Sequence, residues 1–232
     1  MSDSAAAVPG AGAEKLRPTG APVSEPLKIG VLISGSGTNL QALIDRIAAG
    51  DLNARIEMVI ASNGKAKGLK RAADAGIQTL ALSREIYEDD PEAADEIIAH
   101  EFRERGVEYI IMAGYMRKVR EPLLALFPNR IVNIHPALLP SFQGAHGIQD
   151  AWCRGVKVTG VTVHFANAVY DQGPIIAQEP VRIEEGMGLD ELEAAIHAVE
   201  HKLYPHVVQL LAEGRVHVLE NGCVRIDPAS QG

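Results

Sequence analysis

Aromatic residues and basic charge are both scarce in this sequence. Phe, Trp and Tyr make up 4% of its 232 residues, although 47% of the residues are hydrophobic. We therefore expect an aliphatic core, and the chain is long enough to bury one substantial domain. The 22 Lys and Arg are outnumbered by 30 Asp and Glu, which gives a net charge of -8. Nucleic-acid-binding surfaces are usually basic, so this balance argues against a nucleic-acid partner.

Cysteines and long apolar segments are also nearly absent. Cys153 and Cys223 are far apart and form no CxxC pair, as expected for reduced thiols in a cytoplasmic protein. No apolar run approaches the roughly 18 residues of a membrane-spanning helix, so we expect no membrane association. The N-terminus lacks the basic start and apolar stretch of a secretory signal. Residues 1–26 are rich in Ala, Pro, Gly and Ser, and we interpret them as a disordered leader.

From Leu27 onward, apolar runs alternate regularly with helical patterns. Uninterrupted apolar runs predict strands buried on both faces, and apolar residues spaced by three and four predict helices. The alternation predicts one domain over 27–232 with a three-layer α/β fold, in which helices cover both faces of a mostly parallel, twisted open sheet. The predicted strands span 27–34, 55–62, 77–82, 107–113 and 130–135, and the predicted helices span 40–47, 66–75 and 91–105.

The pattern changes after residue 155. Two β-rich runs, 157–166 and 174–183, are joined by a short polar segment and predict antiparallel strands added to the sheet. A long helix follows them, and Pro205 should kink it. Near the C-terminal end, Asn221-Gly222 is typical of a tight hairpin turn.

The segment Gly35-Ser-Gly-Thr-Asn39 lies between the first predicted strand and the first predicted helix. Backbone N–H groups at a helix N-terminus carry partial positive charge, and glycines let such a backbone approach a phosphate closely. The segment is neither a GxGxxG fingerprint nor a P-loop, because no Lys follows the second glycine. The residues alone leave two interpretations open, a phosphate-binding loop and a plain strand–helix turn.

Asn133 and His135 lie two residues apart on the fifth predicted strand, directly before Pro136. Residues at this spacing point to the same side of a strand. Pro136 cannot continue the hydrogen-bond ladder, so His135 should lie at the carboxyl end of the strand, where open α/β sheets bind ligands. An amide donor and an imidazole suit acyl transfer. The alternative is an Asn that satisfies a loop and a His that packs at the end of a strand.

Three other sites are less specific. Asp171 stands before Gln-Gly-Pro and is either a turn residue or a carboxylate that orients His135. His164 is interpreted as a core histidine within a strand. His197 and His201 have the HxxxH spacing of some zinc ligands, but their surroundings do not form HExxH, and we expect no metal site.

Several of these segments together resemble the folate-dependent formyltransferases, and within that family the branch that acts on glycinamide ribonucleotide. The Asn-x-His-Pro segment followed by Asp-x-Gly-Pro is highly specific for folate-dependent formyl transfer. The Gly-Ser-Gly-Thr-Asn loop separates the glycinamide ribonucleotide branch from its relatives. The similarity keeps the order of the family over residues 27–215, in the stretches 31–42, 113–117, 131–142, 144–146, 161–165, 171–176 and 200–205.

The resemblance implies transfer of the formyl group of the co-substrate 10-formyltetrahydrofolate to the amine of glycinamide ribonucleotide, in purine biosynthesis and without a metal. It implies a nucleotide-binding half over 27–130 and a catalytic and folate-binding half over 131–232. The implied catalytic residues are Asn133, His135 and Asp171. The implied substrate-binding residues are Gly37, Thr38, Asn39, Gly114, Pro136 and Glu200, and the implied folate-binding residues are Arg84, Met116, Arg117, Val119, Asn133, Asn167 and Asp171. Residues 166–170 are less acidic and more apolar than the family pattern.

Other functions were weighed against this one. A methionyl-tRNA formyltransferase normally carries a C-terminal nucleic-acid-binding domain, and a formyltetrahydrofolate hydrolase carries an N-terminal regulatory domain; we expect neither here. The alternative from another class is a non-catalytic nucleotide-binding module that uses the glycine loop, and the trio of Asn133, His135 and Asp171 argues against it. We expect a monomer or a homodimer.

Overall fold

The computed structural model describes residues 25–229, so the predicted leader lies outside the described residues except for its last two positions. A seven-stranded sheet has the order β3-β2-β1-β4-β5-β6-β7. The strands β1 to β5 are parallel, and β6 and β7 continue the sheet in antiparallel orientation. Their bounds are β1 Leu27–Ile33, β2 Ala54–Ala61, β3 Thr79–Ala81, β4 Tyr109–Met112, β5 Ile131–His135, β6 Val158–Phe165 and β7 Ile175–Arg182. The predicted α/β class with late antiparallel strands is confirmed.

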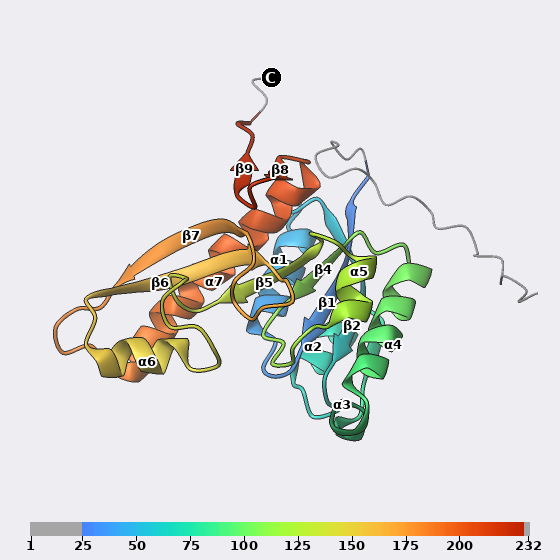
Figure 1. The fold of residues 1–232 in the computed structure, drawn as a ribbon, viewed down its shortest axis with the longest axis horizontal. Helices are drawn as coiled ribbons and strands as arrows, with labels where there is room; N and C mark the ends of the chain where they lie inside the picture. Colours follow the sequence, from blue (N-terminus) through green and yellow to red (C-terminus); the bar gives the residue numbers. More distant parts are fainter. Residues whose placement is uncertain (1–24, 230–232) are drawn as a thin grey trace, which may run out of the picture.

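Helices cover the sheet on both faces (Figure 1). On one face, α1, α2 and α7 contribute to a large aliphatic cluster that includes Leu40, Ala72 and Leu192. On the other face, α3, α4 and α5 contribute to a second cluster that includes Tyr87, Ile98 and Leu123. The bounds are α1 Thr38–Ala48, α2 Gly68–Asp74, α3 Arg84–Asp89, α4 Pro91–Glu104, α5 Glu121–Leu126, α6 Gly147–Arg154 and α7 Leu189–Ala212. The low aromatic content thus produces the aliphatic core expected from the sequence.

The second cluster does not extend along the whole sheet. Its buried members within residues 25–229 end at Ile131, at the start of β5, whereas the first cluster continues through Val161 and Val163 on β6. On one face, β5 and β6 therefore pack against α7. On the other face, the cluster formed with α3, α4 and α5 does not extend to β6. Asn133 and His164 lie on this less covered part.

The long helix α7 stabilises the centre of the sheet. It is one continuous helix through Pro205, where the sequence predicts a kink. The hydroxyl of Tyr204, which is fully buried, donates to the carbonyls of Val132 (2.8 Å) and Met112 (3.1 Å). These bonds tie the helix to the second residue of β5 and to the last residue of β4, and a buried hydroxyl without such acceptors would be costly. The helix therefore holds in place two of the strands next to the candidate site.

The remaining elements are short. The predicted hairpin at Asn221-Gly222 is confirmed by β8 (Val216–Val218) and β9 (Val224–Ile226), which pair antiparallel. Three short helices, α3, α5 and α6, lie where we predicted none. Within residues 25–229, no helix combines the length and the apolar character needed to cross a membrane.

Candidate active site

The glycine loop after β1 is packed closely against α2 at Gly37. Gly37 has φ 71°, and a Cβ at this position would lie 2.6 Å from the Cα of Gly68 at the start of α2. The N–H of Gly68 donates to the carbonyl of Gly35, and the guanidinium of Arg71 donates to the carbonyl of Ser36. No side chain in the described part of the chain caps α1, so the N–H groups of its first turn remain available to an anion.

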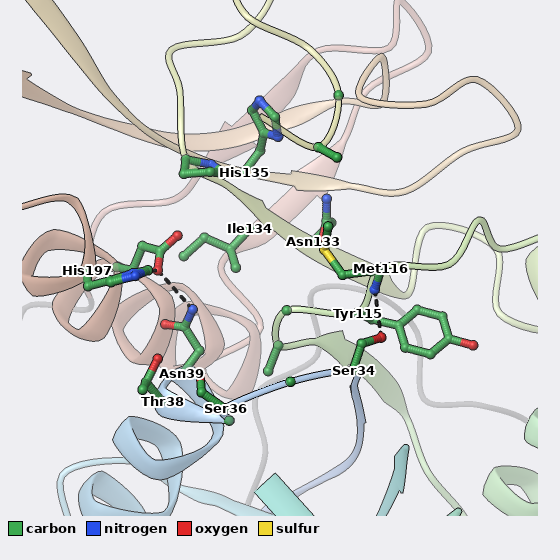
Figure 2. A pocket seen from close by; sticks show the side chains of 18 of the residues that line it. Ser34, Ser36, Thr38, Asn39, Tyr115, Met116, Asn133, Ile134, His135 and His197 are labelled. Atoms are coloured by element: carbon green, nitrogen blue, oxygen red, sulfur yellow. Dashed lines mark hydrogen bonds and ion pairs between the residues drawn. The ribbon is translucent and has the colours of Figure 1, made fainter. Parts of the chain in front are cut away.

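A buried carboxylate lies directly beside this loop. Oε2 of Glu200, on α7, accepts hydrogen bonds from Nδ2 of Asn39 at 3.0 Å and from Nδ1 of His197 at 2.9 Å. The hydrogen bond to Glu200 raises the pKa of His197 above its ordinary value, and burial opposes it only in part. Figure 2 shows this group on the side of the cavity formed by α1 and α7.

The ends of β1 and β4 are held together by Ser34. Its backbone N–H donates to the carbonyl of Gly114, and its hydroxyl accepts from the backbone N–H of Met116 at 2.8 Å and lies 2.7 Å from the hydroxyl of Ser62. Gly114 has φ 76°, a left-handed conformation that favours glycine. The turn after β4 is thus fixed against the glycine loop.

Register places a further histidine, His164, beside the predicted Asn-x-His pair. In the antiparallel pairing of β5 with β6, Asn133 is opposite His164 and His135 is opposite Thr162. Side chains directly opposite each other in such a pair lie on the same face with Cβ atoms about 4.5–5.5 Å apart. Nδ2 of Asn133 lies 3.2 Å from Nε2 of His164. Thr162 donates to the carbonyl of Ala137 and so fixes the chain just after His135.

His135 is 3% exposed, and both of its ring nitrogens face acceptors. Nε2 lies 2.8 Å from the carbonyl oxygen of Phe142, and Nδ1 lies 3.5 Å from Oδ2 of Asp171. The same carboxylate oxygen accepts from the backbone N–H of Gly144 at 2.9 Å. Asp171 itself has φ 54° in the loop 166–174 between β6 and β7. The structure therefore brings Asp171 together with Asn133 and His135, although it is 36 residues beyond His135 in the sequence.

Two cavities meet at this cluster. The first has a volume of about 340 Å³ and is lined in part by the glycine loop (Figure 2). The second lies against the loop 166–174. Asn133 and Tyr170 line both cavities. Of the predicted residues, Gly37, Thr38, Asn39, Gly114, Met116, Asn133, His135, Pro136 and Glu200 line the first cavity, and Arg117, Val119, Asn133, Asn167 and Asp171 line the second.

Arg84 stands apart from the other predicted residues. It lies on α3, is largely exposed, and forms an ion pair with Glu88 at 2.6 Å. It lines neither cavity, so the structure does not bring it together with the rest of the site.

Sequence reasoning missed several lining or supporting residues. Ser34, Tyr115 and Tyr170 line the cavities, and their positions flank predicted motifs, which is the one signal that pointed to them. His164 was assigned to the core because its partner depends on strand register. Arg71 was missed because its contact with Ser36 joins two elements 35 residues apart.

The arrangement combines an amide, an imidazole and a carboxylate at the carboxyl end of β5 with the glycine loop that follows β1, the second strand away in the sheet. Such a set suits transfer of an acyl group to a nucleophile, because the amide and imidazole can stabilise an oxyanion. Within the described residues, no group of three or more His, Cys, Asp or Glu side chains could hold a metal. The fold and the site thus define an acyl- or formyl-transfer enzyme.

The sequence pattern of the formyl transferase family matches residues 27–208, and the chain belongs to this family. It is 38% identical over 184 residues to the phosphoribosylglycinamide formyltransferase of Bacillus subtilis, covering 79% of this chain and 94% of that protein. It is also 38% identical to the human trifunctional purine biosynthetic protein adenosine-3, of which it spans only 19%.

Solved structures agree with this assignment. The glycinamide ribonucleotide transformylase 1 of Symbiobacterium toebii superposes with a TM-score of 0.85 at 44% identity, covering 90% of this chain and 100% of the other. A formyltetrahydrofolate deformylase from Pseudomonas syringae has a TM-score of 0.82 at 23% identity, and this likeness concerns the fold alone.

Proposed function

We propose that this enzyme transfers the formyl group of 10-formyltetrahydrofolate to the amine of glycinamide ribonucleotide, giving formylglycinamide ribonucleotide and tetrahydrofolate in purine biosynthesis. The observation that carries the proposal is that two cavities share Asn133 as a lining residue. One lies beside the glycine loop 35–39, and the other lies beside the loop 166–174, which carries Asp171. A reaction between two substrates needs both reacting groups held close together, and the shared boundary of the two cavities offers such a place.

The first cavity takes the ribonucleotide. The glycine loop and the first turn of α1 hold its phosphate, with Gly37, Thr38 and Asn39 nearest. Glu200 accepts hydrogen bonds from the ribose hydroxyls while Asn39 and His197 hold its carboxylate in place. Gly114 and Pro136 line the cavity, and the absence of a side chain at Gly114 leaves room for the attacking amine.

The second cavity takes the folate. Arg117, Val119 and Asn167 line it, and Met116 reaches the junction from the first cavity. In this arrangement residues 27–130 supply the nucleotide loop and part of the folate contacts, and residues 131–232 supply the catalytic trio. Arg84 lines neither cavity and is left out of this folate site.

The reaction proceeds by attack of the substrate amine on the formyl carbon. A C–N bond forms, the carbonyl oxygen becomes an oxyanion, and the bond from the formyl carbon to the folate N10 then breaks. Asn133 and His135 stabilise the oxyanion, and Asp171 orients His135. The proton lost by the amine passes to the departing N10 through His135, Asp171 or water, so that N10 leaves as a neutral N–H group.

The proposal is tested by the absorbance change that accompanies conversion of 10-formyltetrahydrofolate to tetrahydrofolate. We expect release of tetrahydrofolate only when glycinamide ribonucleotide is present, with one formylated product for each folate released. Folate release without the amine would identify a hydrolase instead, and no release with either substrate would contradict formyl transfer. The proposal also places the enzyme in the cytoplasm, as a monomer or a homodimer. Analytical ultracentrifugation of the full chain measures this oligomeric state.

A further inference from the structure

Each ring nitrogen of His164 makes one hydrogen bond, and the two bonds together determine which nitrogen carries the proton. Its Nδ1 lies 2.9 Å from the carbonyl oxygen of Phe165, and its Nε2 lies 3.2 Å from Nδ2 of Asn133. A carbonyl oxygen only accepts, so Nδ1 carries a proton. In a neutral imidazole Nε2 is then an acceptor, and it matches the amide N–H that Asn133 presents. The two contacts together describe one neutral tautomer, with the proton on Nδ1.

The surroundings of His164 favour this neutral form. The side chain is 2% exposed, and burial lowers its pKa below the ordinary value. The titratable groups that face it are Asp171 on the loop 166–174, which favours the charged form, and His135 on β5, which opposes it. Oδ1 of Asp171 is 3.7 Å from Nε2 of His164, beyond hydrogen-bond distance. The other oxygen, Oδ2, is engaged by Gly144 and faces His135.

The polar cluster is therefore divided into two chains of contacts. In one, Asp171 orients His135. In the other, the carbonyl of Phe165 fixes the proton of His164, and His164 fixes the amide of Asn133. An unrestrained amide could turn by 180° and present its oxygen where its NH₂ group now lies. With one N–H committed to His164, the second N–H of Asn133 keeps a defined direction.

We propose that His164 is a positioning residue which, as the neutral Nδ1–H tautomer, holds the Asn133 amide with its second N–H toward the reacting carbonyl oxygen. This inference rests on the proposed function for its catalytic meaning, since it assigns no contact of His164 with either substrate. A flipped amide would present a lone pair to the developing oxyanion and would repel it. The contribution of Asn133 to the transition state thus depends on the state of His164.

The first test is the tautomer itself, measured by ¹⁵N NMR of the full chain labelled at histidine. His164→Gln assigns the resonance. Near pH 7.5 we expect one ring nitrogen of His164 with the shift of a protonated nitrogen and the other with that of an unprotonated one, with the proton coupled to Nδ1. An imidazolium pattern, or a proton on Nε2, would overturn the proposal.

The second test uses a double-mutant cycle. His164→Leu removes the acceptor at similar volume, and we expect kcat to fall about 10²-fold, as for loss of one oxyanion donor, while both KM values change less than about threefold. His164→Gln restores an acceptor and should recover at least tenfold of the loss. If His164 acts through Asn133, Asn133→Ala/His164→Leu will be no slower than Asn133→Ala alone. Multiplied effects in the double variant would show independent roles and refute the inference.

Controls separate this inference from a general loss of structure and from failure of the proposed function. His100, exposed on α4, supplies the matched variant His100→Leu, which should keep wild-type kcat. If His164→Leu unfolds, the tautomer and the Gln variant still decide the matter. A wild-type chain that forms no formylated ribonucleotide contradicts the function alone, whereas active His164→Leu with wild-type kcat contradicts only the role of His164.

Discussion

A single methyl group added at Gly173 should disturb the site through the backbone. Gly173 lies two residues after Asp171, and a Cβ at this position would overlap the carbonyl oxygen of Phe165 at the end of β6. Carbon and oxygen atoms approach no closer than about 3.3 Å in ordinary contacts. Because the clash is with backbone, no side-chain rotation relieves it. In Gly173→Ala the loop must therefore move away from β6 by more than about 1 Å.

The consequence is expected in catalysis more than in stability. Crowding of this kind costs about 1–3 kcal/mol of folding free energy, which a domain of this size tolerates. Displacement of the Asp171 carboxylate by about 1 Å breaks its hydrogen bond with Gly144 and its contact with His135. A misplacement of that size costs about 10²-fold in rate. We expect kcat to fall by about this factor, with a smaller change in the KM for the ribonucleotide.

The assay is steady-state formyl transfer together with thermal unfolding of the same preparation. Gly64→Ala is the matched control, because a Cβ at Gly64 finds its nearest neighbour 4.0 Å away, at Ala81. That variant should keep wild-type kcat and melting temperature. Wild-type turnover in a folded Gly173→Ala chain would show that the position of the Asp171 loop does not govern the reaction, and the reasoning from geometry would be refuted.

Three further predictions concern chemistry, binding and stability. Asn133→Ala, His135→Ala and Asp171→Ala should each lower kcat at least about 10²-fold in a folded protein; near-normal turnover removes that residue from the mechanism. Asn39→Ala breaks the hydrogen bond to Glu200 and should raise the KM for the ribonucleotide about 5- to 100-fold, and an equal rise for folate would indicate a purely structural loop. Burial raises the pKa of Asp95 from 3.8 to about 6, so the stability that its protonated form contributes is lost as pH rises through that value. Urea unfolding should therefore show wild type losing stability relative to Asp95→Asn between pH 4 and pH 7, and a constant difference would contradict this sign.

The sheet was predictable because its signals are local. The segment 27–34 is a nearly continuous apolar run, and the structure buries it on both faces as β1. The N-cap at Asp90, followed by Pro91, is likewise local, and its carboxylate accepts from the backbone N–H of Ala93. These features can be predicted from the sequence because they depend only on residues that are close together in the chain.

The short helices were missed because they have too few residues for a periodic stripe. The helices α3 and α5 have six residues each and α6 has eight, and two turns or fewer show almost no repeat. One signal was available for α3, since Ser83 caps it by accepting from the N–H of Ile86. For α6, tertiary contacts with α7 and the hydrogen bond of Trp152 to Met187 supply what the local sequence does not.

Within the site, spacing predicted one half of the cluster and could not predict the other. Asn133 and His135 lie on one strand, so their common direction follows from the two-residue repeat of a strand, and both line the first cavity. Asp171 reaches His135 across 36 residues through a loop with a left-handed residue at its tip. No periodic pattern in the sequence predicts that this loop brings Asp171 back to His135. The role of Asp171 was therefore inferred from the family resemblance, and it remains a prediction.

The two antiparallel strands explain why the cluster forms at β5. A parallel neighbour would have to be reached by a long crossover, and its carboxyl end would lie beside that of β5. An antiparallel neighbour instead lays the carboxyl-terminal half of β6 opposite Asn133 and His135, so His164 and Thr162 become their cross-strand partners. The same reversal sends the chain into the loop 166–174, which carries Asp171 back to His135. A slip of one residue in this register would turn His164 to the opposite face of the sheet. The pairing of β5 with β6 is therefore the step at which the fold creates the chemistry.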